Sequence, residues 1–538
     1  MCNIYKDQKK GSCNHHDHKE WSRRSFVKAL GIVGGGSMAL ANTSLTVSQP
    51  SLLEAALNQS DNDRVLVLIR LKGGNDGLNT IIPYYDYDNY ARVRETIRIK
   101  EDQLFKLNTD FAMPKYANDM QYLWDQGQMK VIHGVGYENS SRSHFTGSDI
   151  WATADINDVQ ETGWAARYFE NIYPDYLVTP PDRPAAIQIG NNGNLIFDGT
   201  DTNFAFSVSN PDQLAQIAEN GVVYDLNGIP DNAHGRQVQY LKGIANTTIK
   251  HSEVINQAYE KTSSSSDYSS DSDIAKQLRV VSRLIRGNLK TKIYLVTIGS
   301  FDTHNNQSAR HSKLMEELSN ALSVFYKELN RDGWGDKVLS MTISEFGRRV
   351  EQNGSGGTDH GTAAPVMIFG GELKGDGFVG NHPDLNDLGQ GGNLKYNQSF
   401  VNIYSTIMKK WLCVPDNLVD RVLGQHPSLD LGFDCPSQSS SSNNKAEDQI
   451  TLSAFEHKII QSRDQPYLYI NNDKTGHIVI KIYNMMGQEV GVLKNEMMFE
   501  GEHKIYFDEI SGITLDTGQY LYRIDKGGQK YSKLFMVQ

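Results

Sequence analysis

The chain has 538 residues, which exceeds the usual size of one domain and predicts two or three folded units. Its composition, 38% hydrophobic and 22% charged, is that of a globular protein. The formal net charge of −11 argues against nucleic acid as a partner, because domains that bind nucleic acid are basic.

The first 41 residues have the features of an export signal. The twin-arginine motif is matched by Ser22-Arg23-Arg24-Ser25-Phe26-Val27-Lys28, and a short apolar stretch then runs from Ala29 to Ala41. A basic region, an apolar core and a final Ala-x-Ala in this order predict a signal peptide over residues 1–41, with the twin-arginine translocase as partner. An uncleaved amphipathic N-terminus is the alternative.

Between residues 60 and 435 short β-branched runs alternate with helical patterns, which predicts an α/β domain. We expect strands at residues 65–71, 130–136, 292–299, 338–344 and 364–371, and a helix over residues 311–330. Because parallel sheets place ligand sites at the carboxyl ends of their strands, polar residues near these ends are the candidates for a functional site.

Five polar motifs flank the predicted strands. They are Gly73-Gly74-Asn75-Asp76-Gly77, Asn139-Ser140-Ser141-Arg142-Ser143-His144, Phe301-Asp302-Thr303-His304, Glu345-Phe346-Gly347-Arg348-Arg349 and Thr358-Asp359-His360-Gly361. With these motifs the segment 60–435 resembles the DUF1501 family, whose activity is not established and which is assigned to the alkaline phosphatase/sulfatase-like superfamily. The resemblance implies an alkaline-phosphatase-like fold, a mostly parallel sheet sandwiched by helices.

The resemblance also implies a metal site. In the superfamily, carboxylates and histidines hold one or two divalent metals beside a nucleophilic Ser or Thr at a helix N-terminus. Carried onto this chain, the ligands are Asp76, Asp302, His304, Glu345, Asp359 and His360. Ser143 is the expected nucleophile and Ser140 its rival, while Arg142 and Arg348 are expected to contact an anionic substrate. The metal would be zinc, manganese or calcium.

Some features depart from the superfamily pattern. Phe346 stands where a metal histidine is expected, and Asp302 and His304 are closer in sequence than is common, so a single metal or none remains an alternative. Asp76 has the alternative role of shaping its turn, and Ser143 that of capping a helix. We expect His144 and His311 to support the site rather than to bind metal. The absence of a Cys-x-Pro-x-Arg motif disfavours a formylglycine sulfatase.

Two functions follow for the central domain. The first is a metal-dependent hydrolase of phosphate or sulfate esters. The second is a non-catalytic surface protein that keeps the alkaline-phosphatase-like fold for binding or structure.

The C-terminal part begins with a Ser-rich linker at residues 436–446, and short strand patterns follow at 467–470, 477–483, 502–507 and 520–524. These patterns predict a small all-β sandwich. With its segments 482–488, 515–520 and 533–537, the stretch 462–538 resembles the sorting domain of the Bacteroidetes type IX secretion system. Gln465-Pro466-Tyr467 departs from the usual Pro-Asn-Pro opening.

That resemblance implies transport through the periplasm and across the outer membrane by the type IX machinery. The protein would then be secreted, or attached to lipopolysaccharide at the cell surface. An ordinary adhesive β-module is the alternative. Cys413 and Cys435 would remain after signal cleavage, and either a disulfide or two buried thiols is compatible with the sequence, with the disulfide slightly favoured.

Overall fold

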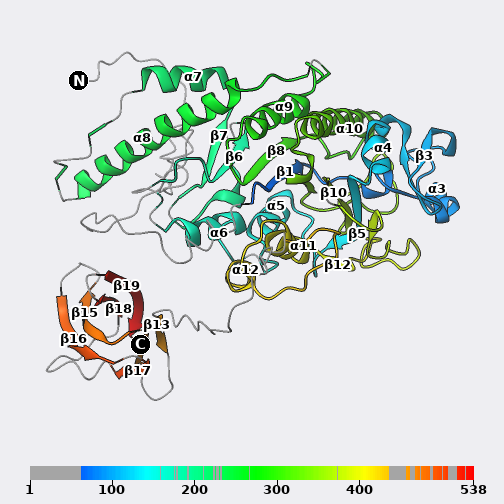
Figure 1. The fold of residues 1–538 in the computed structure, drawn as a ribbon. Helices are drawn as coiled ribbons and strands as arrows, with labels where there is room; N and C mark the ends of the chain where they lie inside the picture. The colour runs from blue at the N-terminus through cyan, green and yellow to red at the C-terminus, as the bar shows by residue number, and fades with distance from the viewer. Residues whose placement is uncertain are drawn as a thin grey trace, which may run out of the picture. The chain divides into compact units, whose positions relative to one another are not determined.

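The computed structural model describes residues 62–435 and 456–537, apart from short gaps within both ranges. The predicted signal peptide (1–41) and Ser-rich linker (436–446) lie outside the described residues. The chain divides into two compact units, the first extending to Ser437 and the second from Gln438 to Gln538 (Figure 1). None of the described helices is both long and apolar enough to cross a membrane.

A large mixed sheet forms the centre of the first unit, with the strand order β11-β5-β10-β9-β1-β8-β6-β7 and with β12 beside β5. Its strands are β1 (Val65–Leu71), β5 (Met129–Gly136), β6 (Ala186–Ile189), β7 (Ala205–Val208), β8 (Ile293–Ile298), β9 (Val338–Ile343), β10 (Ala364–Gly370), β11 (Phe378–Val379) and β12 (Gln398–Ser399). The described pairings are parallel except for the two that involve β10. The mostly parallel sheet and all five predicted strands are therefore confirmed.

Both faces of this sheet are buried. In β1, Leu66 and Leu68 pack into one hydrophobic core, and Val67 and Ile69 pack into the other. Successive side chains of a strand point to opposite faces, so a continuous apolar run such as Val65–Leu71 supplies two cores at once.

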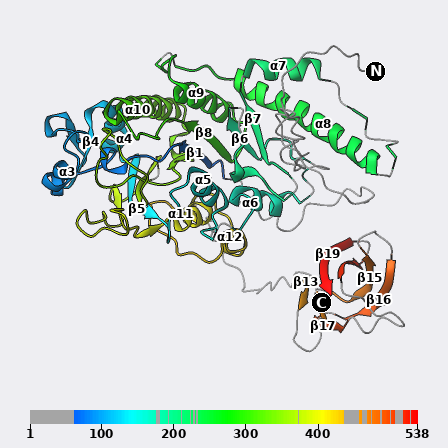
Figure 2. The same ribbon diagram turned by 180° about the vertical axis from the view of Figure 1, so that it is seen from behind.

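Helices cover the two faces of the sheet (Figures 1 and 2). One core includes side chains of α5 (His144–Thr153), α6 (Trp164–Ile172), α11 (Phe400–Thr406) and α12 (Asp416–Leu423). The other includes α4 (Asp119–Asp125), α8 (Ala233–Glu260), α9 (Asp273–Arg286) and α10 (Gln307–Arg331). The helix expected over 311–330 is α10, which contacts the sheet through Leu318, Leu322 and Phe325 among others.

Smaller elements complete the first unit. The strands β2 (Ile82–Pro83), β3 (Leu104–Lys106) and β4 (Phe111–Pro114) form a separate sheet beside α3 (Tyr87–Val93), and α7 (Pro211–Asn220) packs on α8. Cys413 and Cys435 form a disulfide with a Cα–Cα distance of 5.7 Å, so the alternative of two free thiols is wrong.

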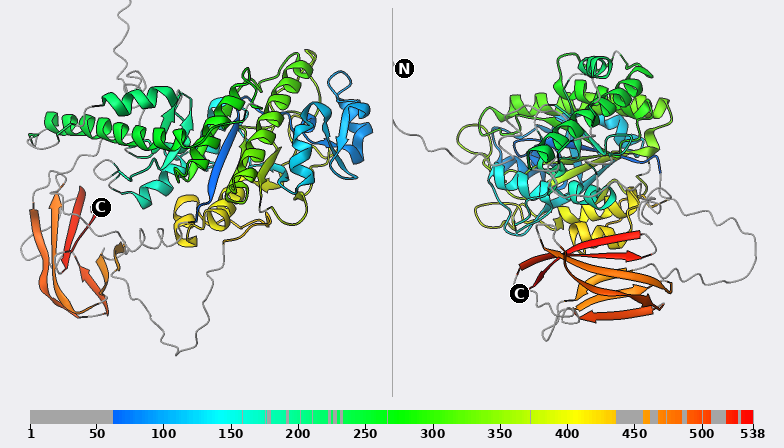
Figure 3. Two further views of the ribbon diagram at one scale, coloured as in Figure 1. Left: turned by 45° about the horizontal axis from the view of Figure 1, so that its top comes forward. Right: turned by 90° about the vertical axis from the view of Figure 1, so that its left-hand side faces the viewer.

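The second unit consists of two antiparallel sheets (Figure 3). One contains β13 (Glu456–Ile460), β14 (Tyr467–Asn472) and β17 (Gly501–Tyr506). The other contains β16 (Glu489–Met498), β15 (Gly476–Asn484), β18 (Gly518–Lys526) and β19 (Gln529–Val537). Leu468 and Ile505 from the first sheet share one core with Ile480 and Ile524 from the second, as expected for a sandwich. β13 lies before residue 462, where the sequence placed the start of this domain.

Candidate metal centre

The polar motifs converge at one edge of the central sheet. Strands β1, β8 and β9 all end at this edge because they run parallel. Strand β10 runs antiparallel to β9, so it begins at the same edge, and the segment before it returns alongside the residues that follow β9. Arg348 and His360 pair as an antiparallel bridge there. One reversed strand thus brings the last motif to the ends of the parallel strands.

Three potential ligand atoms form a close triangle at this edge. The Nε2 atoms of His304 and His360 are 2.9 Å apart, and Oδ1 of Asp302 lies 3.1 Å from the first and 3.2 Å from the second. Two ligands of a tetrahedral zinc ion at the usual bond lengths are about 3.3 Å apart. The triangle therefore has the size of one face of a metal coordination sphere.

His144, at the start of α5, adds a fourth potential ligand. Its Nε2 atom is 3.4 Å from Oδ2 of Asp302. The ligand atoms of His144, Asp302 and His360 all lie within 4.8 Å of one another. The four residues His144, Asp302, His304 and His360 are called the metal centre below.

Each histidine of the metal centre has an oxygen atom next to its other ring nitrogen. The pairs are His360 Nδ1 with the Arg142 carbonyl oxygen at 2.8 Å, His304 Nδ1 with Asp359 Oδ1 at 3.5 Å, and His144 Nδ1 with Glu345 Oε1 at 3.0 Å. An acceptor beside Nδ1 keeps the proton there and leaves the Nε2 lone pair for a cation. The ring orientations are thus those expected of metal ligands.

Local electrostatics favour the ligating protonation states. Burial by itself raises the pKa of Asp302, but the hydrogen bond and the positive charge of Arg348 act against it, and the pKa is about 2. The pKa of His360 is lowered, mainly because burial disfavours its charged form. Near neutral pH, Asp302 is an anion and His360 is neutral.

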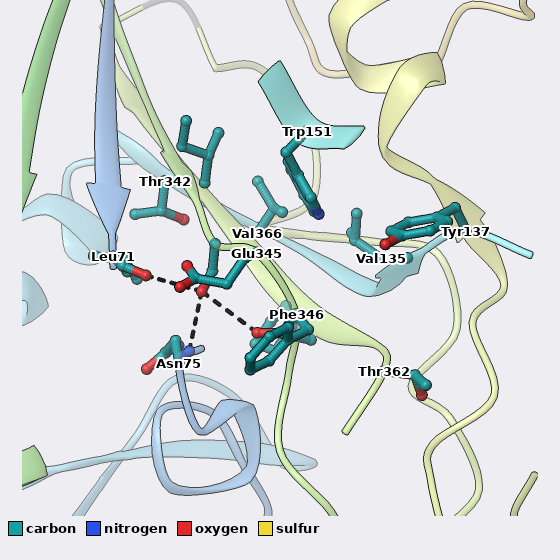
Figure 4. Close-up of a pocket in the computed structure, with 15 residues that line it drawn as sticks. Leu71, Asn75, Val135, Tyr137, Trp151, Thr342, Glu345, Phe346, Thr362 and Val366 are labelled. Carbon is teal, nitrogen blue, oxygen red and sulfur yellow. Dashed lines mark hydrogen bonds between the residues drawn. The ribbon is translucent and has the colours of Figure 1, made fainter. Parts of the chain in front are cut away.

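Phe346 forms an apolar floor under the metal centre. Its ring centroid is 5.0 Å from that of His144 and 4.4 Å from that of His360. The turn that follows β1 needs glycine at position 74, where φ is +84° and a Cβ would lie within 2.6 Å of the Phe346 ring. Phe346 and Glu345 also line a small internal cavity of about 10 Å³ (Figure 4).

Two expected site residues have other contacts in the structure. Glu345 lies behind His144 instead of among the ligand atoms, because its buried Oε1 accepts hydrogen bonds from His144 and from the Gly73 amide. Arg348 is fully buried and donates to Asp302 Oδ1 at 2.7 Å and to the carbonyl groups of Gly74 and Thr358. The Arg348 guanidinium therefore orients Asp302 and does not face a substrate.

The structure places Asp76 in a separate buried network. Its Oδ2 atom is 2.6 Å from Nη1 of Arg94, and the two side chains are 1% and 0% exposed. Gln307 also donates to this oxygen, while its own Oε1 accepts from Thr358 and from Thr303, which lies between Asp302 and His304. Because the cation beside Asp76 is Arg94, the metal centre does not include this carboxylate.

The candidate nucleophiles differ in availability. The Ser140 hydroxyl donates to the Tyr137 carbonyl at 2.6 Å. Ser143 is exposed at the N-cap of α5, and its side chain makes no capping hydrogen bond within the described helix, so the capping role does not apply.

The arginine at position 349 was not singled out by the sequence. The side chain of Arg142 is exposed, and Arg349 is the partly exposed member of the Arg348-Arg349 pair. A Cβ built on Gly391 would be 3.7 Å from Arg142 Nη1 and 3.9 Å from Arg349 Nη2, so the two guanidinium groups approach the same loop.

Residues 231–432 match a family described as "Protein of unknown function (DUF1501)", a range that includes the motifs at Asp302, Glu345 and His360. The predicted family resemblance is confirmed over that range. No curated protein matches the sequence.

Several solved structures resemble the chain. They include a protein in the alkaline phosphatase superfamily from Vibrio parahaemolyticus (9% identity, TM-score 0.28, covering 76% of this chain and 75% of that one). Others are a lipoteichoic acid synthase from Listeria monocytogenes (9%, 0.27, 80% and 86%) and a sulfatase from Pseudoalteromonas sp. (11%, 0.30, 87% and 85%). At these identities and TM-scores the likenesses carry no inference about activity.

Proposed function

We propose that the first unit is a metal-dependent hydrolase of phosphate or sulfate esters that uses the metal centre. The observation that supports this best is the shared orientation of three histidines, each with Nδ1 beside an oxygen acceptor and Nε2 turned toward Asp302 or its neighbours. Two Nε2 atoms that both lack a proton cannot form a hydrogen bond with each other at 2.9 Å, whereas a cation bound by both lone pairs would satisfy both atoms.

The types of ligand atom in the metal centre favour some metal ions over others. Three imidazole nitrogens and one carboxylate suit zinc or manganese better than calcium, which prefers six to eight oxygen ligands. A divalent ion held there would polarise an ester oxygen and stabilise the negative charge that develops on it.

Residues of the chain itself would supply the remaining chemistry. Ser143 presents a hydroxyl group beside His144 at the start of α5, where backbone amides favour an oxyanion. Arg142 and Arg349 would bind the acidic group of the ester through paired N–H donors. Glu345 and Arg348 hold His144 and Asp302 in position.

The deciding experiment measures the metal content of the purified full-length chain by elemental mass spectrometry. We expect about one zinc or manganese ion per chain, lost in Asp302→Ala and His360→Ala and retained in the control His234→Ala, whose side chain is exposed on α8. Turnover of phosphate or sulfate esters that a chelator abolishes would then identify the reaction. A folded chain that binds no metal after reconstitution would refute the hydrolase and favour the non-catalytic binding or structural protein.

We also propose that the chain is exported by the twin-arginine route and then by type IX secretion, to be released or attached to lipopolysaccharide. The Cys413–Cys435 disulfide supports this, because disulfides persist in oxidising compartments. Cell fractionation should find the Arg23→Lys/Arg24→Lys variant in the cytoplasm and the control Lys9→Arg/Lys10→Arg outside it. Equal export of both variants would contradict the route.

A further inference from the structure

A polar cleft of about 150 Å³ lies next to the metal centre. It is formed by the ends of β1 and β9, by α5 and by the segment after β6, and its polar lining includes Arg70, Ser148, Asp149, Asn194 and Glu345. One water molecule needs about 10–15 Å³ of such space, so the cleft is large enough for a small organic group.

Glu345 connects the cleft to the metal centre. Its Oε1 atom contacts His144, and the same residue lines the cleft. Its Oε2 atom has no hydrogen-bond partner among the described residues, although the side chain is only 2% exposed. Ser148 follows His144 by one turn of α5, so a group in the cleft would lie close to the metal centre.

The lining mixes opposite charges. Arg70 donates through Nη2 to Ser148 Oγ at 2.9 Å, while Asp149 contributes a carboxylate. An anionic ligand would meet the Asp149 carboxylate, and a cationic ligand would meet the Arg70 guanidinium group. An uncharged group with several hydroxyls matches both, because each hydroxyl donates and accepts.

Apolar surfaces accompany these polar groups. Trp151 and Leu195 line the cleft. Phe145 is 85% exposed, which is unusual for its size, and precedes Asp149 by one turn on the same face of α5. An exposed aromatic ring beside a polar cleft can pack against the C–H face of a ring-shaped polyol.

We infer that this cleft binds an uncharged, hydroxyl-rich organic group the size of one sugar ring. The inference rests on the proposed function in one respect, namely that this group is the alcohol part of the ester whose acidic part faces the metal centre.

The test is a titration of the chelator-treated full-length chain with methyl α-D-glucopyranoside and with myo-inositol, followed by saturation-transfer NMR. We expect saturable binding with a Kd on the order of millimolar, at least tenfold weaker in Arg70→Met and Phe145→Ala and unchanged in the control Arg92→Met. Ser148→Ala, a smaller change, should also weaken binding and guards against misfolding of the Arg70 variant. Absence of saturable binding, or displacement of both probes by inorganic sulfate, would overturn the inference.

The two proposals can fail separately. Binding of the polyols without any ester turnover would leave the cleft assigned and refute the hydrolase. Turnover of aryl esters without polyol binding would support the hydrolase and refute the assignment of the cleft.

Discussion

Replacing Arg94 with methionine should destabilise the first unit by about 3–5 kcal/mol, the usual cost of removing one partner from a buried ion pair. The Arg94 and Asp76 side chains are 0% and 1% exposed, and their charged atoms are 2.6 Å apart. The guanidinium group also donates to the carbonyl oxygens of Arg349 and Val350, which would lose these bonds. The variant therefore leaves a desolvated carboxylate and two orphaned acceptors.

The pH dependence has a defined sign. Burial alone would raise the pKa of Asp76, but Arg94 outweighs burial and lowers it. In the native chain this pair therefore stabilises the fold above the unfolded pKa of Asp and loses its effect as pH falls through the lowered pKa. Without Arg94 the Asp76 pKa rises, so the loss should be largest at neutral pH and smaller in acid.

Urea denaturation of the full-length chain, followed by circular dichroism, measures this cost. The control Arg92→Met removes an exposed arginine two positions away and should change stability by less than about 0.5 kcal/mol. Adding Asp76→Asn to Arg94→Met should recover part of the loss, because it removes the uncompensated charge. A loss below about 1 kcal/mol in Arg94→Met, or no recovery in the double variant, would refute this account of the network.

Three further changes have defined outcomes. Burial lowers the pKa of His133 to about 3 and that of His382 to about 4, so unfolding takes up protons below pH 6.5 and stability should fall from pH 6.5 to 4. His133→Phe should flatten this fall in urea midpoints measured at pH 7 and pH 5, and an unchanged slope would contradict it. Removing the disulfide with Cys413→Ala/Cys435→Ala should cost about 3 kcal/mol for a 22-residue separation, seen as a lower thermal midpoint; an unchanged midpoint would argue against it. Glu345→Gln should weaken metal affinity by about 10–100-fold in competition with a chromophoric chelator while the fold persists, and full affinity would show that Glu345 does not position His144.

The sequence allowed the sheet to be predicted because its strands are continuous apolar runs, as buried parallel strands are. It did not show that β10 is reversed, because periodicity carries no strand direction. Because β10 is reversed, His360 lies beside Asp302. The motifs could therefore be identified from the sequence, but their arrangement in space could not.

Nothing in the local sequence indicates that His144 lies among the ligand atoms and that Glu345 lies behind it. Both residues follow predicted strands, and which one faces the metal centre depends on packing around Gly73 and Phe346. Phe346 looked like a lost ligand in the sequence, yet in the structure its ring supports two histidines. Asp76 could not be placed because its partner Arg94 lies outside all five motifs.

The reversed strand also has a consequence for the order of assembly. His144 and Glu345 are 201 positions apart in the chain, and His360 reaches His304 only after β10 has paired with β9. No short segment contains all four residues of the metal centre, so an ion can be held by the complete set only once most of the sheet has formed, and such long-range pairing is slow. Under the proposed twin-arginine route, which carries folded proteins, this timing would make the cytoplasm the compartment that determines which metal the secreted protein carries.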